Sequence, residues 1–101
     1  MRAAHKIATS ELVRVTSVII DRLLSELPDR FNDGYHTDHS DEITGYKGVS
    51  AHLYTAPNNS RSLSLQVMGP ERMISAIAHR YGRHYTVWAR EPGKVILQIR
   101  S

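Results

Sequence analysis

Residues 69–84 are the segment that most constrains the fold, because its start, its two sides and its end can all be read from the sequence. Pro70 suits the first turn of a helix, and Gly82 suits a left-handed residue just past its end. At about 100° per residue, one side of this helix is apolar and the other is polar. The apolar stripe holds Met73, Ile74, Ile77 and Tyr81, and the opposite side holds Arg72, Ser75, His79 and Arg83, with Arg80 at its border. We expect the apolar stripe to pack and the polar side to face solvent.

Segments before and after this helix alternate apolar and polar residues with a period of two, which is typical of strands with one wet face. They are residues 49–54, 62–67, 85–90 and 94–100. Residues 56–60 and 91–94 have turn composition, so each pair of segments should form an antiparallel hairpin. A further short strand is expected near residues 42–46.

A first helix is predicted to begin at Ser10, a good N-cap, and to end near Glu26 or Leu27, because the residue before Pro28 disfavours helical geometry. Its apolar residues cover more than half of its circumference, more than a sheet alone would cover. They are Leu12, Val13, Val15, Ile19, Ile20, Leu23, Leu24 and Leu27, with Val18 further round. We expect Val13, Val18, Ile20 or Leu24 to remain partly exposed unless a second helix or a second subunit covers them, and we predict a homodimer.

Together these elements predict an α+β fold: a two-layer sandwich with two helices on one face of a four- or five-stranded antiparallel sheet. The element order is α-(β)-β-β-α-β-β. The 101 residues should form a single domain, with residues 1–8 as a frayed lead-in. The predicted core consists of Leu12, Ile19, Leu23, Leu53, Leu65, Ile74, Ile77, Leu97 and Ile99.

The register of the last hairpin decides where Trp88 lies. A two-residue Pro92-Gly93 turn would place Trp88 beside Leu97 in the core, but this dipeptide suits turns that twist against a tight hairpin. A loop one residue longer would instead put Val87 and Ala89 in the core. The other face would then hold Trp88, Arg90, Ile96, Gln98 and Arg100 together with His52, Tyr54 and Gln66. A slip of one residue exchanges the two sets.

Charge is unevenly distributed along the chain. Residues 1–42 hold five Lys or Arg against eight Asp or Glu, and residues 43–101 hold eight against two, giving −3 and +6. Ten of the thirteen cations are Arg, whose planar fork binds phosphate or carboxylate in a bidentate manner. The basic C-terminal part therefore favours an anionic partner.

No pattern indicates catalysis, a cofactor or a membrane span. His36 and His39, with Asp38, Asp41 and Glu42, have the residue types of a metal site, but the Gly and Asp content of this stretch favours a polar loop. GxGxxG, Walker-type and HExxH motifs are absent, and neither His52 nor His84 has a recognisable nucleophile or orienting acid. The chain has no cysteine and no long apolar run, so we expect a cytoplasmic protein.

The most specific functional hypothesis is a small nucleic-acid-binding regulatory module for DNA or RNA. Cations on one exposed helix side can contact successive phosphates, and His79 adds charge as the pH falls. Trp88 and Tyr54, flanked by Arg90 and Arg100, resemble in type the stacking platforms that hold single-stranded RNA. The candidate binding residues are Arg72, His79, Arg80, Arg83, Trp88 and Arg90.

In element order, residues 10–100 resemble the double-wing DNA-binding domain of some phage transcription factors, in which a helix and strand pair repeats. They share no motif with it, so no residue role is carried over. The alternative function is a protein-interaction or dimeric regulatory module, viral or plasmid-borne, that binds a protein partner through an apolar or sheet surface.

Overall fold

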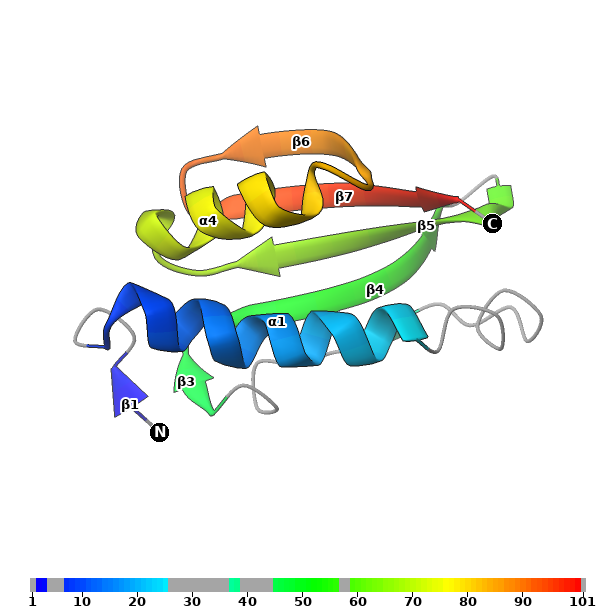
Figure 1. The fold of residues 1–101 in the computed structure, drawn as a ribbon. Helices are drawn as coiled ribbons and strands as arrows, with labels where there is room; N and C mark the ends of the chain where they lie inside the picture. Colours follow the sequence, from blue (N-terminus) through cyan, green and yellow to red (C-terminus); the bar gives the residue numbers. More distant parts are fainter. Residues whose placement is uncertain (1, 4–6, 26–36, 39–44, 57–58, 101) are drawn as a thin grey trace.

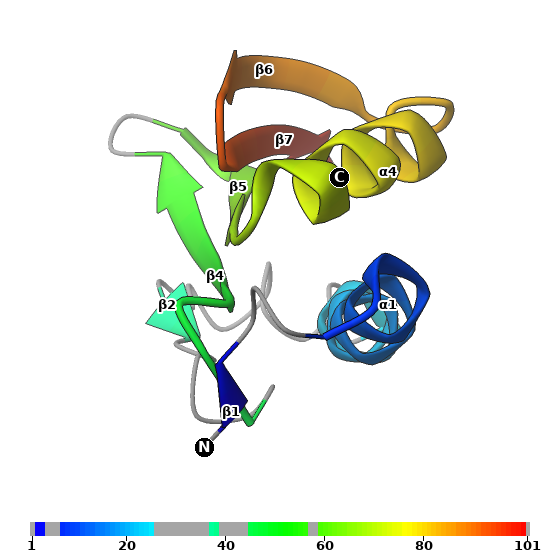
Figure 2. The same cartoon turned by 90° about the vertical axis from the view of Figure 1, so that its left-hand side faces the viewer.

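The computed structural model describes residues 2–3, 7–25, 37–38, 45–56 and 59–100. These residues form two layers, a sheet and a pair of helices that lie on one of its faces (Figure 1, Figure 2). The elements are β1 (Arg2–Ala3), α1 (Thr9–Ser25), β2 (Thr37–Asp38), β3 (Tyr46–Lys47), β4 (Ser50–Ala56), β5 (Asn59–Met68), α4 (Glu71–Tyr81), β6 (Thr86–Glu91) and β7 (Lys94–Arg100).

The sheet has five strands in the order β2-β4-β5-β7-β6, and every neighbouring pair is antiparallel. Strands β5 and β7 lie inside the sheet, while β6 and the two-residue β2 form its edges. The predicted α+β sandwich, with both helices on one face of an antiparallel sheet, is therefore confirmed.

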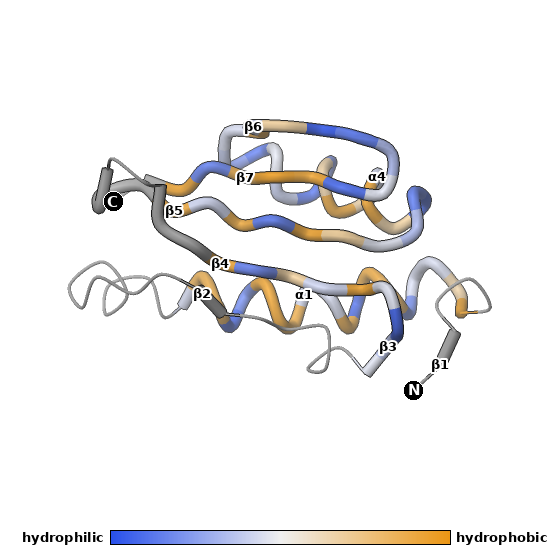
Figure 3. Tube along the Cα trace, turned by 180° about the vertical axis from the view of Figure 1, so that it is seen from behind, coloured by the Kyte–Doolittle hydropathy of each residue, from blue (hydrophilic) through white to orange (hydrophobic). Residues whose placement is uncertain are grey.

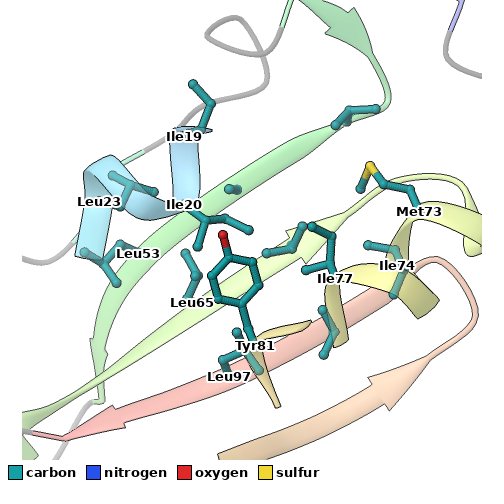
Figure 4. Packing of buried hydrophobic residues seen from close by; sticks show 14 of the residues in the cluster. Ile19, Ile20, Leu23, Leu53, Leu65, Met73, Ile74, Ile77, Tyr81 and Leu97 are labelled. Atoms are coloured by element: carbon teal, nitrogen blue, oxygen red, sulfur yellow. The ribbon is translucent and has the colours of Figure 1, made fainter. Parts of the chain in front are cut away.

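One hydrophobic core fills the space between the helices and the sheet. Apolar and polar residues alternate along β5 (Figure 3), and buried and half-buried residues alternate along β7, so one face of each strand points to the helices. All nine residues of the predicted core are buried. Side chains from α1 and α4 meet over the residues of β4, β5 and β7 (Figure 4).

Helix α4 buries the predicted stripe of Met73, Ile74, Ile77 and Tyr81. It begins at Glu71, so Pro70 is the N-cap and does not lie in the first turn as predicted. The expectation of a left-handed Gly82 is wrong, because Gly82 has φ −64° and ψ −12° and continues the helical turn. A side chain would not fit there, since a Cβ at Gly82 would lie 2.5 Å from the carbonyl oxygen of Ala78. Glycine is thus required for close approach and not for a positive φ.

Helix α1 is covered by the sheet and by α4. It begins at Thr9, so Ser10 lies within the first turn and is not the N-cap, and its predicted end at residues 26–27 lies outside the described residues. Ile20 is fully buried, whereas Val18 is 58% exposed. Helix α4 therefore covers part of the apolar surface of α1, which from the sequence alone could equally have been covered by a second subunit.

A short parallel pair, β1 with β3, lies outside the main sheet. Arg2–Ala3 of the expected lead-in thus forms a strand, paired with Tyr46–Lys47. The buried Tyr46 donates a hydrogen bond to the Glu11 carboxylate, 3.4 Å away, which links this pair to the first turn of α1.

The β6–β7 hairpin combines the two registers considered from the sequence. Glu91 pairs with Lys94, so the loop is the two-residue Pro92-Gly93 turn and the longer loop was wrong. Gly93 has φ +79°, as the third residue of a type II turn requires. A register shift at Trp88 then restores the pairing of Val87 with Leu97 that the longer loop would have given. The expectation that Val87 and Ala89 join the core is nevertheless wrong, because β6 is an edge strand on which Val87 is 41% exposed and Ala89 is half-buried.

Ile77→Ala and Leu97→Ala should each reduce the free energy of unfolding by about 2 to 5 kcal/mol, because each leaves a cavity in the core. Val18→Ala is the matched control and should change it by less than about 0.5 kcal/mol. Denaturant unfolding followed by circular dichroism measures all three. Equal effects of the three substitutions would contradict the assigned core.

Candidate nucleic-acid interface

The solvent-facing side of α4 and the turn after it carry most of the candidate cations. Arg72, Ser75, His79, Arg80 and Arg83 are all exposed, as the helical periodicity predicted. No Asp or Glu occurs between Glu71 and Glu91. His84, which the sequence analysis did not assign to the binding surface, is also exposed, and it follows Arg83 in the turn. We call His79, Arg80, Arg83 and His84 the basic corner.

Arg83 and His79 lie one helical turn apart and contact each other. The Arg83 Nη2 atom is 3.1 Å from His79 Nε2. Since a guanidinium can only donate hydrogen bonds, His79 Nε2 accepts here and carries no proton. The pair presents one guanidinium and one imidazole at the surface.

Arg80 is directed toward α1. Its Nη1 atom donates to the Ser17 hydroxyl at 3.4 Å, and its guanidinium lies 5.7 Å from the centre of the Tyr81 ring. Tyr81 in turn donates to the Asp21 carboxylate at 2.7 Å. Burial, and then this hydrogen bond, raise the pKa of Tyr81 to about 12, so it remains a donor at neutral pH. Arg80 therefore belongs partly to the α1–α4 contact.

Arg72 lies at the other end of α4. Its guanidinium donates to the backbone carbonyl of Ile7, ahead of α1. Arg72 lies in the first turn of α4, whereas Arg83 lies in the turn that follows the end of the helix at Tyr81. Arg72 and the basic corner therefore mark opposite ends of one surface.

Arg90 lies on the helix side of the sheet, which corrects the prediction that it shares a face with Trp88. Arg90 is the cross-strand partner of the buried Val95, and its guanidinium binds both Glu71 carboxylate oxygens at 3.1 and 2.6 Å. Glu71 also accepts from the Gly93 N–H at 2.8 Å. We call Glu71, Arg90 and Gly93 the hairpin lock, because they join the first turn of α4 to the tip of the β6–β7 hairpin.

The hairpin lock explains two pKa shifts. Hydrogen bonds from Arg90, and then from the Gly93 backbone, lower the pKa of Glu71. The hydrogen bond to Glu71 raises the pKa of Arg90. The sequence indicates that Glu71 begins α4 and that Gly93 lies in a turn. Only the register of the β6–β7 hairpin, which the sequence did not determine, brings the two residues together.

Trp88 is 66% exposed on the edge strand β6. It is the extra residue of the register shift between Val87 and Ala89. On the sheet face away from the helices, the half-buried His52, Gln66 and Ile96 lie in one cross-strand row. The side chains of Tyr54 and Arg100, proposed as companions of Trp88, lie outside the described residues.

A metal site is not formed within the described part of the chain, where no three His, Asp or Glu side chains come together. His36, His39, Asp41 and Glu42 lie outside that part. Neither described helix is long and apolar enough to cross a bilayer. No family model, curated protein or solved structure matches this chain.

Replacing Glu71 by Gln should lower the thermal midpoint at neutral pH, because it removes the charge that Arg90 and Gly93 bind. The pKa of Glu71 is lower in the folded chain, so its contribution is present above the unfolded pKa and is lost as the pH falls through the folded pKa. The difference between wild type and Glu71→Gln should therefore shrink in acid, as melting curves from neutral to acidic pH would measure.

Glu91→Gln is the matched control, since it removes an exposed ion pair with Lys94 in the same hairpin. Its effect on the midpoint should be smaller. Arg90→Gln should destabilise like Glu71→Gln. An Arg90→Gln protein of unchanged stability would show that the hairpin lock does not hold the hairpin to α4.

Proposed function

We propose that this protein is a small, non-catalytic nucleic-acid-binding regulatory module of the cytoplasm, which contacts phosphates through the exposed side of α4. The observation that carries the proposal is the basic corner: four cation-capable side chains on exposed residues, in a stretch without acids from residue 72 to residue 90. Such a surface attracts the phosphate backbone irrespective of base sequence.

The contacts rank the candidate residues for this role. Arg83 ranks first, because its contact is to the exposed His79, four residues before it. Arg80 and Arg72 rank next, since each also bonds to another part of the chain. Arg90 ranks last, because its charge is paired with Glu71 at 2.6 Å. Asp21, near Tyr81, bounds the basic corner on the side of α1.

A protein-interaction or homodimeric module is the second candidate function. The exposed apolar side chains Val18, Met68, Val87 and Trp88 favour it, because such groups occur in protein interfaces. Ile20 is buried within one chain, so it does not need a second subunit to cover it and does not support a dimer. Salt separates the two candidates, since phosphate binding weakens steeply with salt and apolar association does not.

The double variant Arg72→Glu/Arg83→Glu should abolish oligonucleotide binding, and Arg83→Ala alone should reduce the log–log salt slope by about 0.9 for duplex or 0.7 for single strands. Fluorescence anisotropy of a labelled oligonucleotide across a salt series measures both. Arg14→Glu is the control, because it reverses an exposed charge on the other helix, α1.

The Arg83 variants should retain wild-type stability to within about 0.5 kcal/mol, because Arg83 lies on the surface. Equal binding by Arg83→Glu and Arg14→Glu would place the interface elsewhere. Absence of binding to both DNA and RNA at about 50 mM salt, where phosphate contacts are strong, would reject the nucleic-acid function.

The homodimer remains a prediction with its own measurement. Light scattering at micromolar concentration should give twice the 11.4 kDa mass of one chain. If Val18 lies in the interface, Val18→Glu should shift the protein toward the monomer. A single-chain mass for wild type would contradict the prediction.

A further inference from the structure

Trp88 lies at a specific irregularity in the edge strand β6. At the hairpin tip, Arg90 pairs with Val95 and Ala89 with Ile96. An uninterrupted ladder would continue with Trp88 opposite Leu97, on the helix side of the sheet. Instead Val87 takes that position, and Trp88 is left as the extra residue. A bulge of this kind re-aims a side chain, and such bulges are frequent at sheet edges and near binding sites.

The result is an exposed aromatic side chain on the strand that follows the basic corner. Trp88 is 66% exposed and the neighbouring Val87 is 41% exposed. Val87 lies close to Gly82, since its methyl group would be 3.3 Å from a Cβ at that glycine. Gly82 directly precedes Arg83 and His84, so the strand that carries Trp88 returns beside the turn that carries these cations.

The charges near Trp88 indicate what chemistry could stack on it. Arg83 and His84 precede it in the acid-free stretch, while Arg90, the nearest cation after it, is paired with Glu71. A partner that places a flat ring on Trp88 should therefore carry negative charge toward the basic corner. A nucleotide combines both groups, and base stacking on aromatic side chains is tolerant of base identity.

We propose that Trp88 stacks on an unpaired base of a single-stranded nucleic acid whose phosphates contact Arg83. This inference rests on the proposed function and adds strand selectivity to it. In a duplex, the base faces are covered by neighbouring pairs, so duplex could use the basic corner but could not reach Trp88 without unstacking. Binding through phosphates alone would not distinguish the two forms in this way.

The experiment uses the full chain and takes advantage of Trp88 being its single tryptophan. A thymidine oligonucleotide of about ten nucleotides, within the range of known single-strand sites, is titrated into the protein while tryptophan emission is recorded. The same strand annealed to its complement is the matched probe. The single strand should quench Trp88 emission, and the duplex should bind without comparable quenching.

Two substitutions test the stacking directly. Trp88→Ala should weaken single-strand binding about 5- to 150-fold, the range expected for the loss of one stacked base, and should leave duplex affinity unchanged. Trp88→Phe keeps an aromatic face and should restore most of the single-strand affinity. Circular dichroism establishes that both variants are folded, and quenching of the wild type gives an answer even if Trp88→Ala does not fold.

The outcomes separate this inference from the proposed function. Salt-sensitive binding that Arg83→Glu removes, with no quenching and no effect of Trp88→Phe or Trp88→Ala, would overturn the stacking role and leave the proposed function in place. Absence of binding to either probe would overturn both. Trp88 emission that changes with protein concentration alone would assign this side chain to self-association and would also overturn the inference.

Discussion

The structure depends on the burial of one side of α4 between α1 and the sheet. Met73, Ile74, Ile77 and Tyr81 contribute to a core shared with α1, β4, β5 and β7 (Figure 4). Each large apolar side chain buried in this way stabilises the fold by about 1.5 to 3 kcal/mol. Because the helix is rigid, burying this stripe also fixes which residues face solvent. The basic corner is thus oriented by the core.

Much of the fold could be predicted because the periodicity of the sequence reflects burial directly. The period-two strands and the α4 stripe specify which residues face the core, and the predicted core residues are buried. The departures depend on contacts that local patterns do not contain. Gly82 continues the turn because of the Ala78 carbonyl, and Arg2–Ala3 forms a strand only because Tyr46–Lys47 pairs with it.

The candidate site was predictable as a set of exposed residues but not as a set of contacts. Helical geometry placed Arg72, His79 and Arg83 on the solvent side. The partners of Arg72 and Arg80 come from residues 65 and 63 positions away, so spacing along the chain could not identify them. Arg90 lies on the sheet face opposite to the predicted one, because the pairing at the hairpin tip differs by one residue from the predicted register. A shift of one residue turns every side chain of the shifted segment to the opposite face.

The hairpin lock and the exposed Trp88 have a common geometric cause. Arg90 reaches Glu71 only in the register of the two-residue turn, whereas Val87 meets Leu97 only in the register one residue away. The Arg90–Glu71 contact and the Val87–Leu97 pairing can coexist only if one residue between Val87 and Arg90 is left out of the ladder. That residue is Trp88. The lock therefore stabilises the hairpin tip in the register that requires the bulge. The same arrangement that holds the hairpin against α4 leaves an exposed aromatic side chain unpaired on the strand that follows the basic corner.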